Sequence, residues 1–139
     1  MILIMEVVIM IDKVEYWLDL CDDNSKSAKL LLNGKQYLDA GFFCHQIAEK
    51  ALKAVIAENT AEIPPKIHKL SRLADMAHLT NELSDDQIRL LVELDPLNIE
   101  ARYPDYKASI AKTLNAERTT KILAETERFL CWIKKRLGK

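Results

Sequence analysis

Apolar positions recur at helical spacing along most of the chain. Over residues 14–32 an apolar side chain returns every three or four positions, with one polar interruption at 22–27. Asp12, with Glu15 three positions later, is typical of a helix start, and the pair Asn33 and Gly34 is typical of a left-handed stop. The pattern predicts a first helix over about 13–33.

The next segment is apolar over an arc wider than one helix face. Apolar residues line one side of the segment 38–56, and Phe43, Ile47 and Ala51 widen that surface. A helix of this kind packs on two sides. We therefore predict that this helix is central and that its residues Phe42, Leu52 and Ile56 are buried.

The remaining elements are delimited by prolines and by one capping box. Two prolines at 64–65 interrupt the pattern, and residues 67–77 predict a short third helix. Ser84 with Gln87 is a capping box that opens a short fourth helix, and the Asp95-Pro96 pair ends it. Residues 97–114 show no sustained period around Pro104, so we predict a long loop there, followed by a long helix over 116–137.

These elements predict an all-α fold: an up-and-down bundle of four to five helices over residues 12–139, with helices 1, 2 and 5 long and two short helices between them. Residues 1–11 are apolar and rich in β-branched side chains, without the basic stretch or cleavage site of a signal peptide. They are also too short to span a membrane. We expect them to form an arm outside the core fold, strand-like or pairing with the edge of another copy.

Composition and charge restrict the kinds of ligand. The 139 residues carry 20 basic and 21 acidic side chains, so there is no global positive field and any RNA or nucleotide site must be a local patch. Three cysteines, Cys21, Cys44 and Cys131, form an odd set without zinc-site spacing. We interpret all three as small buried hydrophobes in a reducing cytoplasm. We expect no metal and no cofactor.

The usual sequence signatures of enzymes are absent. The chain has no Gly-rich phosphate loop, no Walker pattern, no nucleophile elbow and no His-Glu-x-x-His pair. Three other segments contain residues able to bind a ligand or move a proton: 42–53 (FFCHQIAEKALK), 65–70 (PKIHKL) and 101–104 (ARYP). A fourth segment, the apolar run FLCWI, stands near the C-terminus at 129–133.

In this order and at these distances, the four segments resemble the HEPN domain over about residues 14–137. The resemblance implies a helical bundle that usually dimerises and is often encoded beside a minimal nucleotidyltransferase in toxin-antitoxin pairs. It also implies that the chain binds nucleotides or cleaves RNA without a metal ion.

The chain departs from the RNA-cleaving members of that family at one position. Those members carry an arginine followed four to six residues later by a histidine, whereas no histidine follows Arg102 in this chain. Cleavage at a 2′-hydroxyl needs a group that titrates near neutral pH, and a guanidinium stays protonated. His45 or His68 would have to act as the proton shuttle if the chain were a ribonuclease.

The candidate ligand site is a set of basic and aromatic residues: Arg102, Tyr103, Lys50, His68 and Lys69. An arginine beside an aromatic residue can grip a phosphate and stack on a base. Each candidate has a structural alternative. His45 fits a hydrogen-bonded core position and His68 a role at the start of the third helix, with Lys66, Lys69 and Arg72 forming a solvated basic face on that helix. Arg102 fits an ion pair with Glu49, which would pin the loop to the bundle.

The sequence favours a non-catalytic nucleotide- or RNA-binding module that forms a homodimer and acts with a nucleotidyltransferase partner in the cytoplasm, with no membrane association. A metal-independent ribonuclease toxin and a purely structural dimerisation module remain as alternatives.

Overall fold

The computed structural model describes the backbone of residues 2–99 and 103–139, and the side chains of residues 13–99 and 103–139. The described residues form helices and connecting turns without strands, which confirms the all-α prediction. The elements are α1 (Ile2–Asn33), α2 (Tyr37–Asn59), α3 (Leu70–Met76), α4 (Asp85–Leu94), the 3-10 turn η1 (Asp95–Leu97), α5 (Pro104–Ala111) and α6 (Ala116–Arg136).

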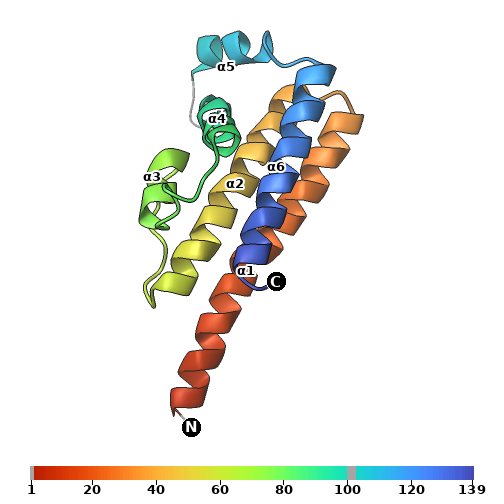
Figure 1. The fold of residues 1–139 in the computed structure, drawn as a ribbon. Coiled ribbons are helices and arrows are strands. Elements are labelled where there is room, and N and C mark those ends of the chain that lie inside the picture. The colour runs from red at the N-terminus through yellow and green to blue at the C-terminus, as the bar shows by residue number, and fades with distance from the viewer. Residues whose placement is uncertain (1, 100–102) are drawn as a thin grey trace.

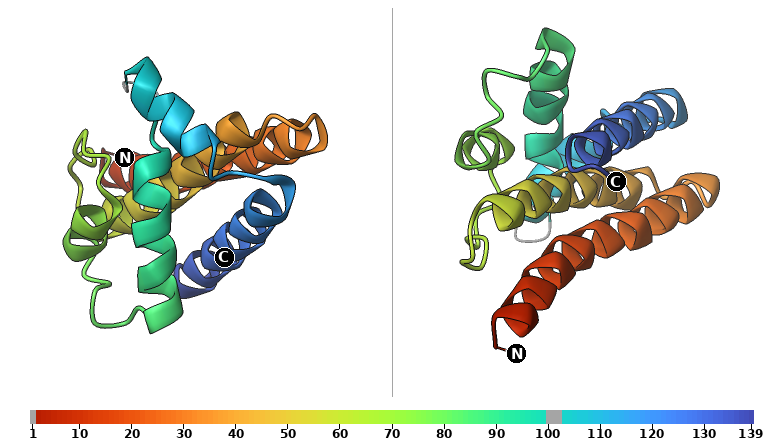
Figure 2. Two further views of the ribbon diagram at one scale, coloured as in Figure 1. Left: turned by 90° about the horizontal axis from the view of Figure 1, so that it is seen from above. Right: turned by 60° about the horizontal axis from the view of Figure 1, so that its bottom comes forward.

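Three long helices form the body of the bundle. Helices α1, α2 and α6 pack side by side, and α1 runs in the opposite direction to the other two (Figure 1). Helices α3 and α4 lie on the other side of α2, and α5 sits across the end where α6 begins (Figures 1 and 2). Helix α2 therefore has neighbours on two sides, as its wide apolar arc predicts.

The core is built around α2. Leu52 has no exposed surface and Ile56 is 5% exposed, so both are buried as predicted. Alanines line much of the same helix and let its neighbours approach closely. Phe42 is only half-buried, which contradicts our prediction for it. Phe42 lies in the second turn of α2, where it borders a hollow that also touches α5, and its ring meets Phe43 edge-on at 5.5 Å between centroids.

The first helix is longer than predicted, because it begins at Ile2 and passes through Asp12 without a break. The strand-like conformation expected for residues 1–11 is therefore wrong for 2–11. Apolar β-branched residues lower helix propensity only slightly, and a helix that continues upstream needs no cap at Asp12. The helix ends at Asn33 as expected, but the left-handed residue is Lys35, with a φ of 60°, and not Gly34. The amide of Gln36 donates to the carbonyl of Leu31, which completes a Schellman motif.

Two further boundaries differ from the sequence prediction. Helix α3 begins at Leu70, so His68 lies in the loop before it and not within the helix predicted over 67–77. Residues 104–111 form α5 within the predicted long loop, because Pro104 occupies the first helical turn, where a missing N–H costs nothing. The capping box of Ser84 and Gln87 is present as predicted.

The cysteines divide into two environments. Cys21 and Cys44 are buried, and burial raises the pKa of each thiol to about 12. Cys131 is exposed on α6, which contradicts its assignment to the core. All three are free thiols.

Two features are absent from the part of the chain that the structure describes. No helix among them is both long and apolar enough to cross a membrane. No group of three or more His, Cys, Asp or Glu side chains in that part of the chain is placed to hold a metal ion.

Candidate functional site

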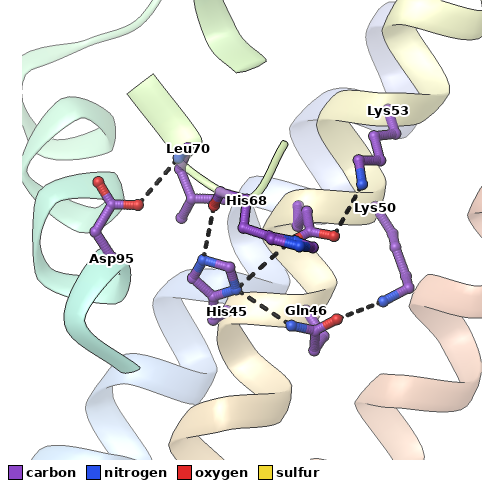
Figure 3. A network of polar contacts seen from close by, with 8 residues as sticks. His45, Gln46, Lys50, Lys53, His68, Leu70 and Asp95 are labelled. Atoms are coloured by element: carbon purple, nitrogen blue, oxygen red, sulfur yellow. Dashed lines mark hydrogen bonds and ion pairs between the residues drawn. The ribbon is translucent and has the colours of Figure 1, made fainter. Parts of the chain in front are cut away.

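A buried carboxylate lies at the centre of a polar network on α2. Glu49 is 3% exposed, and its Oε1 accepts a hydrogen bond of 2.9 Å from Nδ1 of His68 while its Oε2 accepts one of 3.0 Å from Nζ of Lys53 (Figure 3). Burial works to raise the pKa of Glu49, but the bonds from His68 and Lys53 and the lysine charge together hold it below its ordinary value. Glu49 is therefore ionised at neutral pH.

Lys53 is one helical turn from Glu49 and is buried with it. Its side chain is 7% exposed, and its ammonium stands 5.6 Å from the centre of the Trp17 ring in α1. The Lys53 ammonium thus lies between the aromatic ring of Trp17 and the carboxylate of Glu49. We singled out Glu49 from the sequence but not Lys53, although a Glu and a Lys four positions apart on an apolar helix are a recognisable signal.

His45 is fully buried, and both of its ring nitrogens face protein atoms. Nε2 lies 3.1 Å from the backbone carbonyl of His68, to which only an N–H can bond, so Nδ1 of the neutral ring accepts from the amide of Gln46 at 3.4 Å. Burial lowers the pKa of His45, and the nearby Glu49 and Asp95 charges only partly offset this. His45 is therefore a neutral imidazole that holds the backbone of the segment before α3.

The start of α3 is held by a residue far away in the sequence. Oδ1 of Asp95 accepts a 3.0 Å hydrogen bond from the backbone N–H of Leu70 (Figure 3). Together with His45 and Glu49, this carboxylate fixes the segment around His68 at three points. The side chain of His68 is nevertheless 60% exposed, so its imidazole is both oriented and accessible.

A cleft of about 330 Å³ opens beside this imidazole. Its walls come from the loop before α3, from η1 with the residue after it, and from α5; the lining residues are His68, Lys69, Asp95, Pro96, Asn98 and Tyr106. Asn98 and Tyr106 flank, in the sequence, the segment that contains Arg102 and Tyr103. Side chains from three segments that are separated along the chain therefore line one cleft.

The structure brings together only part of the predicted ligand set. His68 and Lys69 line the cleft, whereas Lys50 does not and donates instead to Oε1 of Gln46 at 2.6 Å. Tyr103 precedes the first turn of α5 and is 85% exposed. Arg102 lies outside the described residues.

The three basic residues expected to form one face of the third helix do not all lie on that helix. Lys66 and Lys69 precede α3, and only Arg72 lies within it. All three are exposed, as expected for solvated side chains.

A larger hollow of about 400 Å³ lies between α4 and α6, away from this cleft. Its charged lining is mixed, and two of its basic residues are already ion-paired, Arg89 with Asp86 and Lys121 with Glu125. Such a surface selects neither an anion nor a cation.

Comparison with known families settles what kind of bundle this is. The sequence model of the HEPN domain family matches residues 14–137, which is nearly the whole chain. This chain belongs to the HEPN domain family. The match covers all the residues of the cleft and of the Glu49 network, and it excludes residues 1–13.

Solved structures share the HEPN fold. The crystal structure of TT1696 from Thermus thermophilus superposes with a TM-score of 0.75 at 21% identity, over 88% of this chain and 97% of that one. The structure of ST0689, described as an archaeal HEPN homologue, gives a TM-score of 0.66 at 22% identity, over 89% of this chain and 97% of the other. At these identities the likeness concerns the fold alone. No curated protein sequence matches this chain.

Proposed function

We propose that this HEPN chain binds a phosphate-bearing ligand, a nucleotide or single-stranded RNA, in the cleft beside His68, and that it does so without turnover. The observation that carries the proposal is the orientation of His68. A buried carboxylate engages Nδ1 at 2.9 Å while 60% of the side chain stays exposed at the edge of a 330 Å³ cleft.

The other lining residues suit such a ligand. Lys69 supplies a cationic group next to His68, and Tyr106, 38% exposed, supplies a ring on which a base can stack. Arg102, which stands between Asn98 and Tyr106 in the sequence, would contribute a guanidinium able to bind phosphate through two parallel hydrogen bonds.

The absence of turnover follows from the histidines. His45 is buried and neutral, with both nitrogens engaged, and no histidine follows Arg102 in the sequence. General acid-base cleavage of RNA usually divides proton transfer between two groups, and the cleft offers one imidazole.

A second candidate function is metal-independent RNA cleavage with His68 as the proton shuttle. The specific observation in its favour is the Glu49–His68 pair, because a carboxylate on one ring nitrogen fixes the tautomer and presents the other nitrogen for proton transfer.

We further propose that the chain acts as a homodimer with a minimal nucleotidyltransferase in a toxin-antitoxin-like pair. This rests on membership of the HEPN family, whose small members are often found in that arrangement. Co-expression with a nucleotidyltransferase encoded beside it, followed by size-exclusion chromatography, tests the pairing, and separate elution of the two proteins would contradict it.

Binding is tested with two defined probes, ATP by calorimetry and a fluorescently labelled single-stranded RNA by anisotropy. We expect Arg102→Ala and Lys69→Ala each to weaken binding about tenfold or more, because each removes a charge-assisted bond of about 1.5–3 kcal/mol. The matched control is Arg89→Ala on α4, an exposed arginine paired with Asp86 and remote from the cleft. Equal losses in the control, or no binding of either probe by the wild type, would refute the proposal.

Cleavage is tested with the same RNA in the presence of EDTA. We expect no products from the wild-type protein. If products appear, His68→Ala and His78→Asn decide between His68 and a contaminant. Asn tolerates the left-handed backbone of His78, whose φ is 58°, so that variant stays folded. Loss of cleavage in His68→Ala alone would establish the ribonuclease and overturn the non-catalytic proposal.

A further inference from the structure

The cleft beside His68 contains a carboxylate, which a site for phosphate alone would not need. Asp95 lines this cleft together with Lys69, yet no ion pair joins the two in the part of the chain that the structure describes. A carboxylate repels a phosphate group at short range. If the cleft holds the phosphate-bearing ligand proposed above, Asp95 has to face another part of that ligand, one that donates hydrogen bonds.

The carboxylate of Asp95 is held in place and still has the capacity to accept. Its Oδ1 accepts the 3.0 Å bond from the amide of Leu70, and Figure 3 shows its other oxygen pointing away from that bond. This carboxylate makes no other hydrogen bond or ion pair among the described residues. An ionised carboxylate has about four acceptor positions on its two oxygens and no donor. Most of these positions, including those of Oδ2, are therefore left for a ligand.

The turn that carries Asp95 is anchored in the core. Asp95 is the first residue of η1, and its carbonyl accepts a 3.4 Å bond from the backbone N–H of Asn98. The adjacent Leu94 and the last residue of the turn, Leu97, are both buried. A side chain on an anchored turn keeps one direction toward a ligand, and this is the property that allows it to discriminate between ligands.

We infer that Asp95 selects guanine over the other bases in this cleft, an inference that rests on the nucleotide or RNA binding proposed above. The Watson–Crick edge of guanine has two adjacent donors, the ring N–H and the exocyclic amino group, and these match the two oxygens of a carboxylate. In adenine and cytosine the amino group stands beside a ring nitrogen that accepts, and in uracil two carbonyl oxygens flank the ring N–H. Those edges would place an acceptor opposite the carboxylate, which leaves both groups without a donor.

The other lining residues place the rest of a guanine nucleotide. A base stacked on the ring of Tyr106 lies in the same cleft as Asp95, and Lys69 supplies a cation for the phosphate. The volume of about 330 Å³ is at the lower end of the range of about 300–1,000 Å³ that is typical of small-ligand sites, which suits a single nucleotide.

The first test compares nucleotides that share the same ribose and triphosphate. Calorimetry on the full chain measures the binding of GTP, ATP and ITP, and ITP differs from GTP only in lacking the amino group. We expect GTP to bind at least about tenfold more tightly than either of the others, because each of them loses a charge-assisted hydrogen bond to the carboxylate. On RNA, the same comparison uses two labelled oligouridylates with one internal guanosine or one internal inosine, measured by anisotropy.

The variant Asp95→Asn separates base selection from the structural role of Asp95. The amide oxygen of Asn can still accept from Leu70, whereas its amide nitrogen is a donor and meets the amino group of guanine as a second donor. We expect this variant to melt near the wild type by circular dichroism and to bind the three nucleotides within about threefold of one another. The control is Asp86→Asn, the same change at an exposed aspartate of α4 outside the cleft lining, which should keep the preference for GTP.

The outcomes distinguish this inference from the proposed function. Binding without a preference for guanine, or a preference that persists in Asp95→Asn, would overturn the inference and leave the binding function in place. An equal loss of affinity for all three nucleotides in Asp95→Asn would assign the carboxylate to the ribose and would overturn it as well. No binding of any nucleotide or RNA by the wild type would refute the proposed function and the inference together.

Discussion

The buried Glu49–Lys53 pair makes a quantitative prediction about stability. Replacing Glu49 by Ala leaves the Lys53 ammonium, whose side chain is 7% exposed, without the carboxylate that lies 3.0 Å away. Breaking a buried ion pair by removing one partner costs about 3–5 kcal/mol. His68 also loses a partner, but its side chain is 60% exposed and water can replace the bond. We expect the free energy of unfolding to fall by about 3–5 kcal/mol.

The assay is urea unfolding followed by circular dichroism. With a slope of about 2 kcal/mol/M, that loss moves the midpoint down by roughly 1.5–2.5 M. The double variant Glu49→Leu with Lys53→Met removes both charges. We expect it to recover most of the lost free energy of unfolding, because a buried ion pair and apolar residues of similar volume stabilise a fold to nearly the same extent. Glu125→Ala is the matched control. Glu125 pairs at the same spacing on α6 with Lys121, whose side chain is 76% exposed, so its loss should cost less than about 0.5 kcal/mol.

The pH dependence has a definite sign. The pKa of Glu49 is lowered in the fold, so its contribution is present above its unfolded pKa of about 4.3 and is lost as the pH falls through the lower folded value. The stability difference between wild type and Glu49→Gln should therefore stay constant from pH 7 to about 5 and shrink below about 4. A loss below about 1 kcal/mol for Glu49→Ala, or a double variant as unstable as the single one, would refute this account of the pair.

Three further predictions concern the core. Leu52→Ala should cost about 2–5 kcal/mol in urea unfolding, because Leu52 is fully buried; a change under about 1 kcal/mol would contradict that burial. In the native protein at pH 8, one thiol, that of Cys131, should react with Ellman's reagent, because burial raises the pKa of Cys21 and Cys44 to about 12; three fast equivalents would contradict this. The pKa of His45 is lowered in the fold, so its contribution to stability is fully present above pH about 6.5, the ordinary pKa of histidine, and declines as the pH falls below that. Its imidazole resonance should titrate with a midpoint below pH about 6.5 by NMR, and a midpoint above that value would contradict the neutral assignment.

Local patterns predicted most of the helical elements. The spacing of apolar residues located α2 and α6, and the capping box of Ser84 located the start of α4, because these signals depend on contacts within a few residues. The same kind of reasoning missed α5, since Pro104 breaks a helix interior and also starts a helix, and the residue alone does not say which.

The candidate site was predicted in its parts and not in its arrangement. The motif residues His45, Glu49 and His68 stood out in the sequence, and their contact in the fold relates two segments about twenty residues apart. Asp95 marked the end of the fourth helix in the sequence but gave no signal of a role in the site, because its bond to the Leu70 amide joins positions 25 residues apart and depends on where η1 packs. Tertiary packing also placed Lys50 away from the cleft that Lys69 lines.

The sequence by itself determined the helical class, the central place of α2 and the family, because periodicity and short motifs are local properties of the chain. Only the tertiary structure decided which polar groups share the interior with Glu49, that His45 is neutral while His68 stays exposed, and that three distant segments enclose one cleft. The physical reason is that burial and hydrogen-bond partners set the charge state and accessibility of a side chain, and both depend on which elements pack together.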